Sequence, residues 1–229
     1  MQISVLLLLF AIALAPTVCT VVYLRTRNKK LLAIIGLGAF AWLVALIRSA
    51  ILQPTYLLIG SPQPPPIWFI GFSAILAGIF EEGFRYKFLK SFVEEGTWLN
   101  GVAFGLGAAL LEILLIYCIP IIKMAIIGET QNFSEMLAGA VERNLVVCIH
   151  VGSALLVMHS LRNRWILGIA VSFHSIVDFV APTLGYYSSL TVWQVESIVA
   201  IFAVVALVIV YLEKIFLSKP AESIIWEVY

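Results

Sequence analysis

Two adjacent glutamates and a nearby arginine stand inside an apolar stretch of this chain. Glu81, Glu82 and Arg85 follow a run of hydrophobic residues that begins near Ile67. On a helix, Glu81 and Arg85 lie four residues apart on one face, so their spacing predicts an ion pair. If the stretch spans a bilayer, a charge near its centre costs about 2.5–3.5 kcal/mol on insertion scales, so these residues mark a candidate functional site.

Further polar side chains stand in later apolar stretches. Glu112 and His150 occur singly, whereas His174 and Asp178 lie four residues apart and would share one face of a helix. At a rise of about 1.5 Å per residue, Glu81, His150 and His174 fall at overlapping depths in their stretches. We therefore hypothesise that these groups converge with the glutamate pair on one site.

Carboxylates and imidazoles in this combination suit the hydrolysis of a peptide bond. A carboxylate can act as general base on a water molecule, and a histidine can orient that water or donate to a developing oxyanion. The same side chains could hold zinc, but the HExxH motif is absent, and His150 and His174 do not share a helix at ligand spacing. The GxSxG and GxGD motifs of other hydrolases are absent as well. We expect no resident metal and no other cofactor.

The amino-acid composition indicates that most of this chain lies in a membrane. Hydrophobic residues make up 62% of it, charged residues only 12%, and the mean hydropathy is +1.05. Soluble domains carry about 25% charged residues, so we predict an integral membrane protein whose surroundings are the lipid bilayer. A net charge of +1, without a basic cluster interleaved with aromatic residues, argues against a nucleic-acid partner.

Seven stretches are long enough to span the hydrocarbon core, which requires about 20 apolar residues in a helix. They are Ile3–Leu24, Leu31–Leu52, Ile67–Leu89, Leu99–Ile122, Val141–Leu161, Trp165–Val180 and Val192–Leu212. A short interfacial helix is predicted from Glu129 to Leu137, and a proline-rich loop from Gln53 to Pro66. The fold prediction is an all-α polytopic membrane protein with one domain over residues 1–229, whose motif-bearing core covers residues 67–181.

The lysines and arginines predict how the chain crosses the membrane. With seven spans, most of them fall on one side, which the positive-inside rule assigns to the cytoplasm. The N-terminus is then outside and the C-terminus inside, with the first span retained. We expect a prokaryotic plasma membrane and a site that is open toward the cytoplasmic half. The residues on the basic side are Arg25, Arg27, Lys29, Lys30, Arg85, Lys87, Lys90, Arg162, Arg164, Lys214 and Lys219.

Three motifs in this order resemble those of a known clan. Glu81-Glu82-x-x-Arg85 is similar to the motif of paired glutamates and an arginine in the CAAX-protease and bacteriocin-processing clan of glutamate-type intramembrane endopeptidases. His150 and His174-x-x-x-Asp178 are similar to the second and third histidine motifs of that clan. Within the clan, the chain most resembles the YhfC family, through its Phe-Glu-Glu opening, the glycine-rich stretch from Gly105 to Glu112 and the Glu142-Arg143 pair ahead of a histidine.

The resemblance implies a role for each site residue. Glu81 would be the general base that activates water with the help of His150, while His174 and Asp178 would stabilise the oxyanion. Glu82 would be a second, supporting carboxylate. Arg85 would hold the glutamate pair in place, and Glu112 would either line the site or pair with another span. The implied substrate is a peptide or protein in the membrane, lipidated or not. The chain departs from the clan or family pattern at Leu106, Val146 and Asp178.

Other functions would use the same residues. A membrane transporter, or a subunit that partners one, could use the buried charges as a substrate pathway, although no matching pair of broken helices indicates inverted repeats. A catalytically inactive scaffold of the same family is a further alternative. At the structural level, Glu81 with Arg85 could be a simple salt bridge, and His174 with Asp178 an interhelical contact worth roughly 1 kcal/mol.

Overall fold

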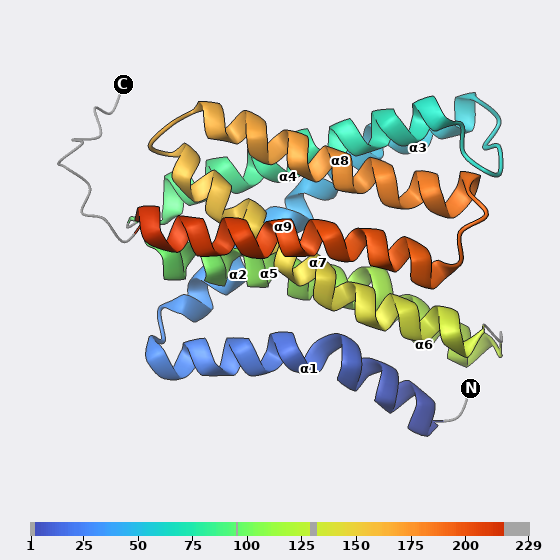
Figure 1. Ribbon diagram of the computed structural model, residues 1–229, viewed down its shortest axis with the longest axis horizontal. Coiled ribbons are helices and arrows are strands. Elements are labelled where there is room, and N and C mark those ends of the chain that lie inside the picture. The colour runs from blue at the N-terminus through green and yellow to red at the C-terminus, as the bar shows by residue number, and fades with distance from the viewer. Residues whose placement is uncertain (1–2, 95, 129–131, 218–229) are drawn as a thin grey trace.

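The described part of the chain is built from helices. The computed structural model describes residues 3–94, 96–128 and 132–217, and these ranges contain helices and no strand. Figure 1 shows the long helices lying side by side along one axis, with the start of the first and the end of the last at opposite ends. The elements are α1 (Ile3–Arg27), α2 (Leu31–Ala45), the 3₁₀ turn η1 (Leu46–Arg48), α3 (Ser49–Leu58), α4 (Ile67–Phe92), α5 (Trp98–Glu112), the π-helical segment η2 (Ile113–Cys118), α6 (Ile119–Ile127), α7 (Phe133–Ser160), α8 (Trp165–Tyr187) and α9 (Val192–Leu217).

Seven helical segments of the described chain are long and apolar enough to cross a membrane. They are Ile3–Arg27, Leu31–Leu58, Ile67–Phe92, Trp98–Ile127, Phe133–Ser160, Trp165–Tyr187 and Val192–Leu217. Each of them contains one predicted span or nearly all of it, so the all-α polytopic class is confirmed. Which end of the bundle faces the cytoplasm stays a prediction.

Two helices continue through prolines at which the sequence predicted an end. The predicted loop from Gln53 begins only at Ile59, because α3 passes Pro54 and runs to Leu58. Likewise, α8 passes Pro182 and ends at Tyr187 instead of Val180. Membrane helices tolerate proline because neighbouring groups and local 3₁₀ or π turns satisfy the freed backbone groups. The second span contains a local 3₁₀ turn, η1, which ends six residues ahead of Pro54.

The fifth span is longer than predicted at its start. Helix α7 begins at Phe133, where the Asn132 side chain caps it by accepting from the Ser134 amide at 3.0 Å. The helix then runs unbroken to Ser160. No separate interfacial helix is present within residues 132–137, because Asn132 caps α7 and residues 133–137 form its start. The first three residues of the expected helix, Glu129 to Gln131, lie outside the described ones.

Glycines let the helices that carry polar residues approach closely. A Cβ on Gly105 of α5 would lie 2.6 Å from the Cα of Val151 on α7, and one on Gly101 would lie 2.7 Å from the Leu155 side chain. Small residues in the fourth span thus allow α5 and α7 to pack closely. Gly78 does the same between α4 and α8, where a Cβ would lie 2.6 Å from the Val171 carbonyl oxygen. These contacts set the distances between the helices around the site.

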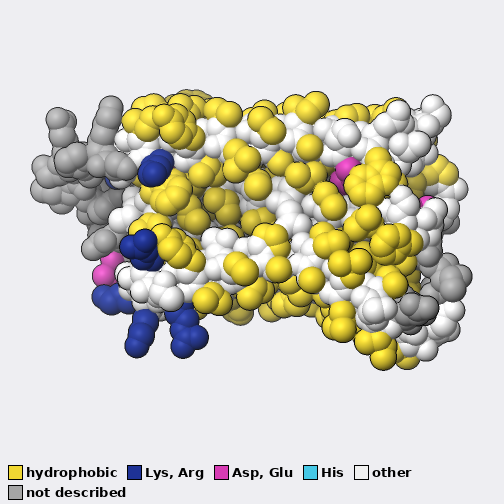
Figure 2. Space-filling view, turned by 60° about the horizontal axis from the view of Figure 1, so that its bottom comes forward, with side chains coloured by type: hydrophobic (Ala, Val, Ile, Leu, Met, Phe, Trp, Pro, Cys, Tyr) yellow, Lys and Arg dark blue, Asp and Glu magenta, His cyan; other side chains and the backbone are white. Residues whose placement is uncertain are grey.

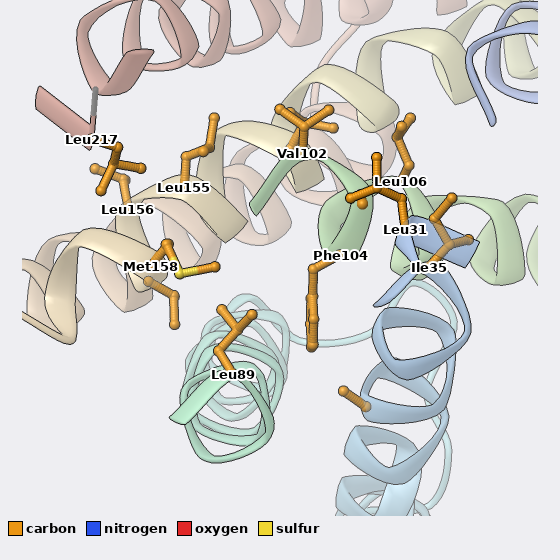
Figure 3. Packing of buried hydrophobic residues seen from close by; sticks show 14 of the residues in the cluster. Leu31, Ile35, Leu89, Val102, Phe104, Leu106, Leu155, Leu156, Met158 and Leu217 are labelled. Carbon is orange, nitrogen blue, oxygen red and sulfur yellow. The ribbon is translucent and has the colours of Figure 1, made fainter. Parts of the chain in front are cut away.

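The largest apolar core lies toward one end of the bundle. It joins residues from the end of α4, the start of α2 and α5, and the ends of α7 and α9, and Figure 3 shows these side chains turned toward one another. Figure 2 shows lysine and arginine side chains gathered at the left end of the molecule, beyond a surface that is mainly hydrophobic. The core residues labelled in Figure 3 are Leu31, Ile35, Leu89, Val102, Phe104, Leu106, Leu155, Leu156, Met158 and Leu217.

Candidate active site

A cavity of about 290 Å³ collects the predicted polar residues from four helices. Glu81 comes from α4, Glu112 from the end of α5, His150 from α7, and His174 with Asp178 from α8. All five line the cavity, so the hypothesis that they converge is confirmed. The other predicted residues, Glu82 and Arg85, are buried and contact the histidines from behind. Three charged residues that were not predicted for the site also line the cavity, namely Arg48, Glu142 and Arg143.

Glu81 presents one carboxylate oxygen to the cavity. Its Oε1 lies 2.8 Å from the guanidinium of Arg48, at a side-chain exposure of only 4%. Its Oε2 is buried, has no hydrogen-bond partner among the described residues and lies 3.5 Å from Nε2 of His174. Oε2 therefore keeps unused lone pairs next to an imidazole nitrogen.

The predicted ion pair between Glu81 and Arg85 is wrong. Arg85 instead bonds both oxygens of Glu82, at 2.6 and 2.5 Å, from a position three residues further along α4. Both i+3 and i+4 neighbours lie within reach on a helix, so spacing could not choose between the two glutamates. The packing of the helices determines which glutamate pairs with Arg85. Glu82 is fully buried between α4 and α8, whereas Glu81 faces the cavity and contacts Arg48.

Glu82 fixes the orientation of His174. Nδ1 of His174 lies 2.6 Å from Oε1 of Glu82. A carboxylate paired with arginine only accepts hydrogen bonds, so Nδ1 carries a proton and donates it. Nε2 is then turned toward the cavity, 3.5 Å from Glu81 and 3.6 Å from Asp178. A carboxylate that holds the far nitrogen of a histidine is the arrangement by which hydrolytic triads orient their imidazole.

His150 is held on both ring nitrogens. The Arg85 guanidinium lies 3.0 Å from Nδ1, and a guanidinium can only donate, so Nδ1 accepts. The proton of the neutral ring is therefore on Nε2, which donates to Oε2 of Glu112 at 2.7 Å. Arg85 thus connects Glu82 with His150, and the two histidine rings lie 6.0 Å apart with an edge-to-face orientation.

Glu112 stands where the fourth span changes its helical geometry. It ends α5, and the π-helical segment η2 follows immediately. Single π turns within α-helices are frequent at functional sites. The Glu112 carboxylate also accepts from Arg143 at 2.9 Å, and Arg143 pairs with Glu142 at 2.7 Å. Tyr117 in η2 donates to the carbonyl of Met136 at 2.8 Å, which fixes η2 against α7.

Arg48 is the site residue that sequence reasoning missed. It stands alone in the second apolar stretch, and a lone charge in such a stretch was the signal that singled out Glu81. Its partner could not be deduced, because a sequence does not show which helices are neighbours. Glu142 and Arg143, the pair ahead of His150 in the sequence, also line the cavity.

Three residues of the site have the chemistry and spacing of metal ligands. Glu81, Glu112 and His150 offer ligand atoms that lie within 4.8 Å of one another, and two carboxylates with an imidazole suit zinc. The hydrogen bonds of His150 do not fit a metal ligand, however. One ring nitrogen accepts from Arg85 and the other donates to Glu112, so neither has a free lone pair. Arg48 and Arg143 also neutralise the two carboxylates already. In this arrangement the residues do not fit a metal.

Comparison with known proteins gives two matches. A family model described as "YhfC intramembrane metalloprotease" matches residues 8–140. That match contains Arg48, Glu81, Glu82, Arg85 and Glu112 and ends before both site histidines. "Uncharacterized membrane protein YhfC" of Bacillus subtilis (strain 168) is 26% identical over an alignment of 172 residues, and the alignment covers 62% of this chain. The match covers 65% of that relative, slightly less than two thirds of its length.

Proposed function

This chain belongs to the YhfC family of membrane proteins, and we propose that it is an intramembrane endopeptidase of the glutamate type. The name of the family model indicates an intramembrane protease. The glutamate-type mechanism is supported by one observation in particular. The Oε2 atom of Glu81 has no hydrogen-bond partner among the described residues and lies 3.5 Å from Nε2 of His174. The proposed substrate is a membrane-associated peptide or protein, lipidated or not.

The proposed reaction begins at Glu81. Its Oε2 accepts a proton from water while the water oxygen attacks the carbonyl carbon of the scissile bond. The carbonyl oxygen becomes an oxyanion, and a doubly protonated His174 donates to it from Nε2. The protonated Glu81 then delivers its proton to the departing amine as the C–N bond breaks. Water has then supplied the hydroxyl of the new carboxyl group and one hydrogen of the new amine.

The remaining residues position these two groups. In our proposal Glu82 and Arg85 hold His174 from behind, and Asp178 contacts it from the cavity side, with a side chain that is 38% exposed. The resemblance implied that His150 helps Glu81 to activate water, and we propose a different role for it. Because both of its nitrogens are engaged, it supports the arrangement through Arg85 and Glu112 and does not itself take a proton from water.

A panel of quenched fluorogenic peptides tests this function with purified protein in proteoliposomes. We expect the parent protein to cleave at least one peptide and Glu81→Gln to lose about 10²–10⁴-fold in kcat, the usual contribution of a general base. Glu94→Gln makes the same chemical change at an exposed position near the end of the third span and serves as control. Cleavage that survives Glu81→Gln would overturn the mechanism. A parent that cleaves no peptide would favour a transporter or an inactive scaffold.

A metal-dependent protease of the same family is the second candidate. Two observations favour it: the ligand spacing of Glu81, Glu112 and His150, and the printed description of the family model. It requires Arg85 or Glu112 to release His150, which would open a nitrogen for the metal. The metal content of the purified protein separates the two candidates.

A further inference from the structure

Lysines and arginines gather at one end of the helix bundle, which we call the basic end. Lysines and arginines lie in the last turns of α1, α4 and α9 and just after the end of α7, and these helix ends are at the left of Figure 1. The opposite end carries the turn that starts at Ile59, the C-terminal end of α6 and the turn that starts at Ser188.

The space between the site and the basic end is filled. Leu89 follows Glu81 along α4 toward that end, and Leu155 follows His150 along α7. Both leucines are fully buried, as are Phe104 of α5 and nearly all of Met158. Figure 3 shows these side chains packed against one another. The apolar core therefore closes the site on its basic side.

The rest of the cavity lies on the other side of the site. Along α7 the lining includes Glu142 and Val146, which precede His150 and so lie toward the start of the helix. Along α8 it includes Ala181 and Pro182, which follow His174 toward Tyr187. Ile116 likewise follows Glu112 along the fourth span, away from the basic end.

This side of the cavity is also the exposed one. The Glu142 side chain is 26% exposed and that of Asp178 is 38% exposed. Ile116 lines the cavity and is 55% exposed, so at this residue the cavity wall is part of the outer surface of the bundle. Its neighbours Leu114 and Ile119 are exposed hydrophobic residues, as expected of a helix face that meets lipid.

We propose that the substrate reaches Glu81 from the end of the bundle opposite the basic residues. By the positive-inside rule that end is extracytoplasmic, so the cavity opens away from the cytoplasm, contrary to our expectation from the sequence. This inference rests on the proposed function. It narrows the substrate to a peptide segment in the extracytoplasmic half of the membrane, because a soluble cytoplasmic tail would have to pass the closed core.

Cysteine labelling tests the direction of access without requiring any activity. Cys19, Cys118 and Cys148 are first replaced by alanine. Val146→Cys then reports on the cavity, Leu190→Cys on the end opposite the basic residues, and Arg162→Cys on the basic end. A membrane-impermeant maleimide is applied to spheroplasts and to inverted vesicles, and total reactivity is measured in detergent.

We expect Val146→Cys to be labelled in the preparation that labels Leu190→Cys, and to be protected in the one that labels Arg162→Cys. Labelling together with Arg162→Cys would overturn the inference. So would reactivity of Val146→Cys in detergent alone, since the cavity would then be closed at both ends. A failed peptide assay alongside the expected labelling would refute the protease function and leave the direction of access intact.

Discussion

Arg48 donates to Glu81 from a neighbouring span, with 2.8 Å between the guanidinium nitrogen and Oε1. Arg48 is the last residue of η1, where α2 gives way to α3, and its guanidinium also donates to the Ala45 carbonyl at 3.3 Å. Both side chains are largely buried, at 15% and 4% exposure. The contact balances the charge of the proposed base from outside its own helix, and it leaves Oε2 to the cavity.

The Arg48–Glu81 pair should behave as a coupled unit in unfolding experiments. Arg48→Met leaves a buried carboxylate without a partner, and breaking a buried pair in this way costs about 3–5 kcal/mol. Arg48→Met/Glu81→Gln removes both charges and should regain most of that loss. Unfolding in detergent, followed by circular dichroism, measures the difference. If the double variant is no more stable than Arg48→Met, the two residues are not coupled.

Glu81 and Glu112 should differ in their contribution to turnover, although both are carboxylates on the cavity wall. Glu81→Gln removes the proposed base, whereas Glu112→Gln only weakens the support of His150. We expect Glu112→Gln to lower kcat by about 10-fold, which corresponds to about 1.4 kcal/mol, and to leave KM nearly unchanged. Steady-state cleavage of one peptide by both variants makes the comparison. Equal losses would assign Glu112 to the reacting groups.

Two glycines of α4 provide a matched test of the helix contact behind the site. A Cβ at Gly78 would collide with the Val171 carbonyl and the Ser175 side chain on α8, whereas nothing lies within 4 Å of a Cβ at Gly83. Gly78→Ala should therefore lower both stability and cleavage, because it separates Glu82 from His174. Gly83→Ala should be neutral or slightly stabilising, since alanine favours helices over glycine by up to about 1 kcal/mol. Similar effects of both substitutions would refute this role of the α4–α8 contact.

The contacts of His150 predict cleavage that does not require a metal. Purified protein should hold zinc and other transition metals well below one ion per chain, and a chelator should leave peptide cleavage unchanged. Mass spectrometry of the metal content provides a measurement that is independent of activity. One bound zinc per chain that is lost in both His150→Ala and Glu112→Gln would establish the metal-dependent alternative.

The sequence determined the elements of this protein and the identity of most site residues. Apolar stretches of bilayer length fix the seven spans, because backbone groups in lipid must be satisfied within a helix. The cost of charge in such spans singled out Glu81, Glu82, His150 and His174, and all of them are found together. The helix ends at Pro54 and Pro182 were predicted too early, because tertiary neighbours allow a helix to pass a proline.

Only the tertiary structure decided which charges meet and where the cavity opens. Helical spacing allowed Arg85 to pair with either Glu81 or Glu82. In the packed structure, where α4 lies against α8, Arg85 pairs with Glu82. Arg48 pairs with Glu81 because η1 lies against α4. This contact joins two separate spans, and no local sequence pattern encodes it. The core at the basic end closes one side of the site, and that closure depends on how residues from α2, α4, α5, α7 and α9 fill a shared volume.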